Sequence, residues 1–455
     1  MNAARIATLT GGRLTGNPDA EILRGRADSR LCRPGDLYIA LQGERTDGNL
    51  FVLPAWESGA DVALADEGKK IPSPPAGKAL VSVSKPLEAL QELARQRRLE
   101  FPELQVIGIT GSNGKTTTKE ILAAILVDWK KDSVLVTEGN YNSDIGLALT
   151  LLNLRPGHDI AVLEMGMNRI DEMALLADLA KPQIAIITNI GSAHIGMLGS
   201  REALAAEKRK IFIGSGEDSV AVIEKGSKWS SFLLDGYPGK VRYFGEWGKN
   251  GWDSYKNLGA DGFLLVRNGL EVTFRIPGEH NLLNAMAAVE AASVLGVPES
   301  SIVKGLETIK PLSGRSEVIN GAVKVIQDSY NANPESLNAA LKLFSSVKTN
   351  GRRVLILGEL LELGNETNNL LRLAGRAAAE ENPDSIFLFG KSLGSLKKAA
   401  ADAGYKGLLK QYVDIKELQN ALSEYLRAGD LVLLKGSRGS ALERLNKTIG
   451  EVSSG

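Results

Sequence analysis

Short apolar runs alternate with stretches of helical periodicity along most of the chain, and the pattern is clearest around residue 106. Apolar residues at 106–109 predict a buried strand, a glycine-bearing loop follows, and apolar side chains then recur at helical spacing from 121 to 129. Further apolar runs at 160–163 and 184–187 are separated by helix-like stretches. We therefore predict a parallel sheet with helices on both faces.

The same alternation on both sides of this region predicts an α/β protein of three domains. We expect a small N-terminal α/β domain over residues 1–84, a central domain over 85–312 and a C-terminal domain over 313–455. The C-terminal runs are each followed closely by glycine, which is a Rossmann-like layout, but without a G-x-G-x-x-G fingerprint we do not predict NAD. The apolar runs of the two outer domains lie at 37–41, 62–65, 80–83, 354–357, 386–389 and 431–434.

Three local signals refine the central domain. A charged helix is expected over 86–98, leading into the strand at 106. Asn268-Gly269 stands between alternating apolar residues and predicts a hairpin over 264–274. An alanine-rich helix is expected over 282–295, and it carries Asn284.

Composition narrows the class of protein. Basic and acidic residues both number 54 in the 455-residue chain, so no global charge favours nucleic acid or an anionic membrane. The single cysteine, Cys32, excludes an internal disulfide framework and fits a reducing compartment. We find no signal peptide, and no apolar run reaches the roughly 18 residues of a membrane span. We expect a cytoplasmic monomer that has no nucleic-acid partner and no membrane span.

The loop after the first central strand has the chemistry of a phosphate-binding loop. Its glycines let backbone N–H groups converge on anionic oxygens, Lys115 can reach the β- and γ-phosphates, and the Thr116 hydroxyl can bind Mg²⁺. The strict pattern G-x-x-x-x-G-K-[ST] would need glycine at Ile109, so a turn that binds nothing is the alternative. The predicted nucleotide contacts here are Gly111, Ser112, Asn113, Gly114, Lys115, Thr116 and Thr117.

Other candidate residues follow strands of the same sheet. Glu164 ends one apolar strand and His194 follows another, and functional groups gather at the carboxyl ends of parallel strands. Glu164 is either a Mg²⁺ ligand or an exposed strand-end charge. The spacing around Lys208 favours a basic, solvent-facing helix, and the polar segment 328–334 fits loop capping as well as ligand binding. One cysteine and three histidines leave no Cys/His metal site.

The motifs in their order resemble the Mur ligase family of peptidoglycan synthesis over essentially the full chain. The compact loop of that family accounts for Ile109. Lys210 stands where the family usually carries glutamate, and Asn49, Ser143 and Gln327 are further departures. The motifs are T-G-S-N-G-K-T-T at 110–117, T-E-G-N-Y-N-S at 137–143, E-M-G-M-N at 164–168, N-I-G-S-A-H at 189–194, D-S-Y-N-A-N-P at 328–334 and G-E-L-L-E-L-G at 358–364.

The resemblance implies an ATP-dependent amide ligase with ATP and Mg²⁺ as cofactors. Its implied partners are UDP-N-acetylmuramoyl-tripeptide (UDP-MurNAc-tripeptide) and D-alanyl-D-alanine, joined through an acyl phosphate. The N-terminal domain would hold the UDP-sugar, the central domain ATP and the C-terminal domain the dipeptide. Three alternatives remain: a sister ligase that adds one amino acid, a folylpolyglutamate synthetase, and a non-catalytic nucleotide-binding module.

The resemblance also implies roles for individual residues. Lys208 matches the lysine that the family carbamylates, which would turn it into a metal-facing carboxylate. The implied catalytic residues are Lys115, Glu164, His194 and Lys208, and the implied metal ligands are Thr116, Glu164, His194 and carbamylated Lys208. Asn284, Arg315 and Asp328 would complete the ATP site. The implied substrate contacts are Ser29, Arg30, Gly43, Arg45, Asp47, Thr137, Asn140, Asn142, Tyr330, Asn331 and Lys435.

Overall fold

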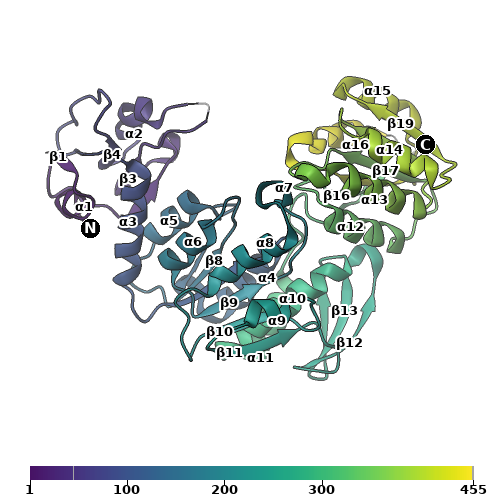
Figure 1. Ribbon diagram of the computed structural model, residues 1–455, viewed down its shortest axis with the longest axis horizontal. Helices are drawn as coiled ribbons and strands as arrows, with labels where there is room; N and C mark the ends of the chain where they lie inside the picture. The colour runs from purple at the N-terminus through teal and green to yellow at the C-terminus, as the bar shows by residue number, and fades with distance from the viewer. Residues whose placement is uncertain (45, 453–455) are drawn as a thin grey trace.

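The computed structural model describes residues 1–44 and 46–452, which form three successive α/β units (Figure 1). The N-terminal and C-terminal units lie at opposite ends of the central unit (Figure 1). Each unit is built on its own main sheet, and a small antiparallel sheet is added to the central unit. The predicted α/β class and the three-unit layout are confirmed. The domain boundaries at 84 and 312 stay predictions.

The N-terminal unit is a five-stranded sheet in the order β1-β5-β4-β3-β2. β1 is antiparallel to β5, and the other neighbours are parallel. The three apolar runs predicted as strands form β3, β4 and β5, while the short edge strands β1 and β2 were not predicted. The elements are α1 Ala3–Thr10, β1 Arg13–Gly16, β2 Arg24–Arg26, β3 Asp36–Ile39, η2 Gly48–Phe51, α2 Val52–Glu57, β4 Val62–Asp66 and β5 Ala79–Val83.

Helix α3 (Pro86–Leu99) joins the first two units. It contacts α1 and β4 on one side and α5 (Asp144–Leu152) and α6 (Glu172–Ala180) on the other. One hydrophobic core therefore continues from the N-terminal sheet into the central unit. The predicted boundary after residue 84 falls directly before this shared helix.

The central unit is a six-stranded parallel sheet in the order β11-β10-β9-β6-β8-β7. Ile107 and Ile109 of β6 pack with α4, α10 and α11 on one face, and Val106 packs with α5 and α6 on the other. The predicted parallel sheet covered on both faces is confirmed. The elements are β6 Gln105–Thr110, α4 Lys115–Lys130, β7 Val134–Val136, β8 Ile160–Glu164, β9 Ile184–Ile187, α7 Ile195–Leu198, α8 Arg201–Arg209, β10 Val220–Glu224, α9 Ser230–Leu234, β11 Lys240–Phe244, α10 Glu279–Val294 and α11 Glu299–Thr308.

A three-stranded antiparallel sheet follows, made of β12 (Trp252–Asn257), β13 (Phe263–Arg267) and β14 (Leu270–Phe274). Asn268 and Gly269 join β13 to β14 with φ angles of 47° and 74°. Two successive positive φ angles are what a tight hairpin turn requires, so the predicted hairpin is confirmed.

The C-terminal unit is a six-stranded sheet in the order β15-β16-β20-β17-β18-β19. Only β15 is antiparallel to its neighbour among the described pairs. The predicted strands at 354–357, 386–389 and 431–434 form β17, β18 and β20. The elements are β15 Glu317–Ile319, β16 Lys324–Asp328, α12 Pro334–Ser346, β17 Arg353–Gly358, η6 Gly364–Glu366, α13 Thr367–Glu380, β18 Ser385–Phe389, α14 Gly394–Asp402, β19 Leu408–Tyr412, α15 Ile415–Tyr425, β20 Leu431–Lys435 and α16 Asn446–Gly450.

Helix length and hydropathy bear on membrane insertion. Among the helices of the described residues, none is both long and apolar enough to cross a bilayer.

Candidate active site

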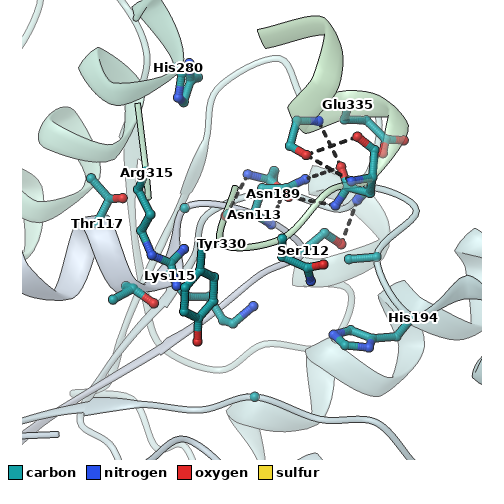
Figure 2. A pocket seen from close by; sticks show the side chains of 18 of the residues that line it. Ser112, Asn113, Lys115, Thr117, Asn189, His194, His280, Arg315, Tyr330 and Glu335 are labelled. Carbon is teal, nitrogen blue, oxygen red and sulfur yellow. Dashed lines mark hydrogen bonds between the residues drawn. The ribbon is translucent and has the colours of Figure 1, made fainter. Parts of the chain in front are cut away.

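A cavity of about 490 Å³ lies where the central and C-terminal units meet (Figure 2). The central unit contributes the loops that follow β6, β8 and β9, and the C-terminal unit contributes the ends of β16 and β20 and the start of α12. The cavity brings together these predicted residues: Ser112, Asn113, Gly114, Lys115, Thr116, Thr117, Asn142, Glu164, His194, Asn284, Arg315, Asp328, Tyr330, Asn331 and Lys435.

The loop between β6 and α4 is a tight cradle. Gly111 and Gly114 have φ angles of 148° and 83°. A Cβ atom at Gly111 would collide with Thr188, and one at Gly114 would collide with Asn284. The Lys115 ammonium donates a hydrogen bond to the Gly111 carbonyl oxygen at 2.8 Å, so this side chain folds back over the loop. Burial lowers the pKa of Lys115, against the opposing effect of the Glu164 charge. This geometry suits a loop that wraps an anionic group.

Glu164 is buried at the end of β8 and faces this cradle. Its Oε1 accepts hydrogen bonds from Thr116 Oγ1 at 3.1 Å and from Asn142 Nδ2 at 2.7 Å. Its Oε2 is buried and has no hydrogen-bond partner in the described part of the chain. A carboxylate oxygen without a partner beside a hydroxyl is a donor set that fits a hard cation such as Mg²⁺. The interpretation of Glu164 as an exposed strand-end charge is wrong.

The described residues hold no cluster of three or more His, Cys, Asp or Glu side chains that could bind a metal ion. A cation beside Glu164 would therefore draw its remaining ligands from hydroxyl, phosphate and water oxygens, as Mg²⁺ at nucleotide sites commonly does.

His194 lines the cavity but faces the C-terminal unit. Its Nδ1 lies 2.8 Å from Glu362 Oε2, and the pairing with His194 lowers the pKa of Glu362. The structure thus brings His194 to the cavity while pairing its ring with Glu362. Its predicted role as a metal ligand stays a prediction.

Lys208 lies on α8 and does not line the cavity. Only 1% of the side chain is exposed, so the solvent-facing helix that its spacing favours is wrong. Burial lowers its pKa well below the ordinary value, and the nearby charge of Lys115 acts in the same direction. A lysine held toward its neutral form meets the chemical requirement for carbamylation. Lys210 instead binds Asp171 and Glu207.

Polar groups of the C-terminal unit close the other side of the cavity. The Lys435 ammonium donates to Asp328 Oδ2 at 2.6 Å and to the Asn331 carbonyl oxygen at 2.9 Å. The Arg315 guanidinium lies 3.8 Å from the centre of the Tyr330 ring, and both lie near Lys115 (Figure 2). The cationic Arg315 and Lys115 therefore face one cavity from two units.

The remaining predicted substrate residues do not line this cavity, although Thr137 Oγ1 accepts a hydrogen bond from the Glu164 N–H at 3.0 Å directly behind it. Asp47 accepts hydrogen bonds from Asn49 and pairs with Lys69, and Arg30 is bound to Asp28. Their predicted contacts with the substrate stay predictions. Arg45 lies outside the described residues. The predicted residues that do not line the cavity are Ser29, Arg30, Gly43, Asp47, Thr137 and Asn140, together with Gly111 and Lys208.

Several residues that line the cavity were not predicted. Asn189 follows β9 and contacts the loop 111–114 between β6 and α4, which we call the phosphate loop after its predicted ligand, since its Oδ1 accepts from the Asn113 N–H at 3.0 Å. Glu335 accepts hydrogen bonds from Ser192 Oγ at 2.5 Å and Arg201 Nη2 at 2.8 Å across the junction. Position at a strand exit could have indicated Asn189. Asn333 and Glu362 lie in the motifs at 328–334 and 358–364, but their partners in the central unit, like those of Glu335, depend on how the units dock, which no local pattern encodes.

The fold and the site together are typical of a nucleotide-binding α/β domain that forms its active site with a second α/β domain. Comparisons with known proteins identify the family. The model of the Mur ligase family catalytic domain matches residues 26–98, that of the Mur ligase middle domain residues 109–292, and that of the Mur ligase glutamate ligase domain residues 314–438. The chain belongs to the Mur ligase family, within the group of the MurF ligases.

Full-length relatives support this placement. The UDP-N-acetylmuramoyl-tripeptide–D-alanyl-D-alanine ligase of Bacillus subtilis is 37% identical, over 98% of this chain and 97% of its own length. The ligase of the same name from Escherichia coli is 31% identical, over 99% and 98%. A crystal structure of MurF from Acinetobacter baumannii has a TM-score of 0.86 at 32% identity and covers 99% of this chain and 98% of that chain. MurF from Thermotoga maritima in complex with ADP has a TM-score of 0.77 at 27% identity, covering 94% and 97%.

Proposed function

We propose that this protein is an ATP-dependent ligase that joins D-alanyl-D-alanine to UDP-MurNAc-tripeptide and so forms UDP-MurNAc-pentapeptide for peptidoglycan synthesis. The observation that carries the proposal is the cavity in which a phosphate loop, a strand-end carboxylate and the cationic groups of the C-terminal unit meet. The names of the full-length relatives and the ADP bound to a MurF structure support the substrates.

The proposed reaction needs no side-chain nucleophile. The peptide carboxylate attacks the γ-phosphorus of ATP, a new P–O bond forms, and the bond to the leaving ADP breaks. The amine of D-alanyl-D-alanine then attacks the carbonyl carbon of the acyl phosphate, loses a proton and displaces phosphate. The protein's task is to orient these groups and to offset negative charge.

The chain's own residues fit this task. The loop N–H groups and the start of α4 would hold the phosphates, and Lys115 would offset the charge that moves to the leaving ADP. Thr116 and Glu164 would hold Mg²⁺, which supplies further positive charge when bound. Asn284, Arg315 and Asp328 would complete the nucleotide contacts.

Finer assignments belong to the same proposal. The N-terminal unit would bind the UDP-sugar, with Ser29, Arg30, Gly43, Arg45 and Asp47 as contacts. Thr137, Asn140, Asn142, Tyr330, Asn331 and Lys435 would contact the peptide substrates. His194 and carbamylated Lys208 would complete the metal site. We also propose that the protein acts as a monomer in the cytoplasm.

The decisive experiment measures ADP release with ATP, UDP-MurNAc-tripeptide and D-alanyl-D-alanine together, and with each omitted in turn. We expect sustained release over many turnovers only in the complete mixture, and a loss of roughly 100-fold or more for Lys115→Ala, because a positioned cation that stabilises transferred charge is removed. ADP release that does not depend on all three substrates would contradict the proposal.

The alternatives give different results in the same assay. A sister ligase would use a single amino acid in place of the dipeptide. A nucleotide-binding module would bind ADP without turnover.

A further inference from the structure

Helix α12 begins at the cavity with Asn333 as its N-cap. Asn333 Oδ1 accepts from the Ser336 N–H at 2.8 Å, and the Asn333 N–H donates to Ser336 Oγ at 3.0 Å. These two bonds form a capping box and would by themselves explain an asparagine at this position.

The same side chain also reaches the phosphate loop of the central unit. Asn333 Nδ2 donates to Asn113 Oδ1 at 2.7 Å, and Asn113 Nδ2 donates back to Asn333 Oδ1 at 3.3 Å. Asn333 is 6% exposed and Asn113 is half-buried, so this pair is partly shielded from water. The two residues are 220 positions apart in the chain, so the pair exists only when the units are docked.

The central unit holds Asn113 through its backbone. The Asn113 N–H donates to Asn189 Oδ1 at 3.0 Å, and its carbonyl oxygen accepts from Thr188 Oγ1 at 2.6 Å and from Asn189 Nδ2 at 3.0 Å (Figure 2). Among the described residues, its side-chain amide is hydrogen-bonded by Asn333. The loop therefore has one set of contacts from its own unit and a second from the start of α12.

We propose that Asn333 is a positioning residue: it ties the N-cap of α12 to Asn113, so that docking of the C-terminal unit and the final geometry of the phosphate loop form together. This inference rests on the proposed function, because it assumes that the loop holds the phosphates of ATP. A residue that only capped its helix would stabilise α12 but leave the loop's performance unchanged.

Two substitutions separate these roles. Serine is as good an N-cap as asparagine, but its hydroxyl is too short to reach Asn113, so Asn333→Ser removes the pair and keeps the cap. Asn333→Ala removes both. We expect Asn333→Ser to melt close to the wild-type temperature while kcat/KM for ATP falls roughly 5- to 30-fold, the effect of losing two neutral hydrogen bonds. We expect Asn333→Ala to melt at a lower temperature as well.

A double-mutant cycle with Asn113→Ala tests whether the two side chains act on ATP kinetics as a pair. If Asn333 only capped its helix, the effects of the two substitutions would be independent. Asn113→Ala keeps all three backbone bonds of that residue, so it removes only the side-chain pair. If the two amides act together, the double variant Asn113→Ala with Asn333→Ser will be no worse than the poorer single variant. Effects that multiply, or wild-type kinetics in Asn333→Ser, would overturn the proposal.

The cycle also distinguishes this inference from the proposed function. Wild-type ADP release that requires all three substrates tests the function by itself. Should the wild type fail that test, the same four proteins are compared by calorimetry for their Kd for ADP, which requires no turnover. Coupled losses of ADP affinity then support the role of Asn333, and independent losses overturn it.

Discussion

Lys208 shows how strongly burial can change the chemistry of one side chain. Its neighbours in the sequence are charged and indicate a basic helix face, yet the side chain is 1% exposed. Desolvation penalises the ammonium form, and the nearby Lys115 penalises it further, so the pKa of Lys208 falls well below its ordinary value. A neutral amine can react with carbon dioxide, whereas an ammonium group cannot.

We predict that the ligase activity depends on carbon dioxide through Lys208. Enzyme prepared in degassed, bicarbonate-free buffer should gain activity when bicarbonate is added. Lys208→Met, which keeps the side-chain volume, should be roughly 10- to 100-fold less active, the range for groups that support a metal site, and should not respond to bicarbonate. Steady-state ADP release measures both effects. Equal activity of the wild type with and without bicarbonate would contradict the prediction.

Cys32 allows a second prediction at this scale, with a defined pH dependence. Burial is the main reason that its pKa is raised from 9.0 to about 11, and the negative charge of Asp36 adds to it. The thiol should therefore not react with thiol reagents at pH 8 in the folded protein but should react fully in urea.

The stability consequence of this shift has a clear sign. Above pH 9 the unfolded chain loses the thiol proton first, so the contribution of Cys32 to the free energy of unfolding should fall between pH 9 and about 11. Cys32→Ala provides the control, because it should lack this part of the decline in urea titrations at several pH values. Rapid labelling of the folded protein at pH 8 would show that burial does not protect the thiol.

At the scale of elements, the strands that are buried on both faces of a sheet were the easiest to predict from the sequence. The continuous apolar runs of β6, β8 and β9 identified central parallel strands, because such strands need no polar face. Edge strands such as β1 and β15 are short and partly exposed, so nothing in their pattern separates them from loops. The phosphate loop could be recognised from the sequence because its tight turn requires glycine at fixed positions, Gly111 and Gly114, where φ is positive.

That geometry leads to a prediction for Gly114, which precedes α4. Gly114→Ala would place a side chain at a φ of 83° and force its Cβ against Asn284, which is itself hydrogen-bonded to Asn281 at 3.0 Å. We expect a loss of about 1–2 kcal/mol in stability from the left-handed backbone and an ADP affinity at least about 10-fold weaker, since the cradle must open.

Gly77→Ala is a matched control for this substitution. Gly77 has a φ of 81°, and no atom lies within 4 Å of the place that a Cβ would occupy, so alanine there carries the same backbone strain without the collision. Calorimetry should therefore find ADP affinity unchanged in Gly77→Ala. Similar ADP binding by both variants would argue against a tight cradle.

At the scale of the whole molecule, the site depends on how two separately built units dock. Sequence reasoning found the residues that each unit places at its own strand ends, such as Glu164 and Asp328. It did not find pairs such as His194 with Glu362, because their chemistry appears only when the units meet. The implied positions of the N-terminal unit lie away from this cavity, so they await a test with the UDP-sugar substrate.

A close backbone approach between the units yields the last prediction. Gly196 of α7 donates its N–H to the Glu362 carbonyl oxygen at 2.9 Å. A Cβ at Gly196 would lie 2.6 Å from Gly364 N and 2.7 Å from Glu362 O, which are backbone atoms of the C-terminal unit and cannot rotate away. Gly196→Ala should therefore push the units apart while leaving each of them folded.

We expect Gly196→Ala to lower kcat at least about 10-fold, because the groups of the C-terminal unit would be displaced by a fraction of an ångström to an ångström from the phosphate loop. ADP affinity should also fall, but by less than kcat, because the displacement disturbs the Asn333–Asn113 pair while the contacts from Thr188 and Asn189 of the central unit to the loop remain. Gly216→Ala is the control, because Gly216 has open space around it. Crystal structures of the two variants should show the C-terminal unit displaced from the central unit only in Gly196→Ala. Full activity of that variant would mean that catalysis does not require the docked arrangement, since no side-chain movement can relieve a backbone collision at this position.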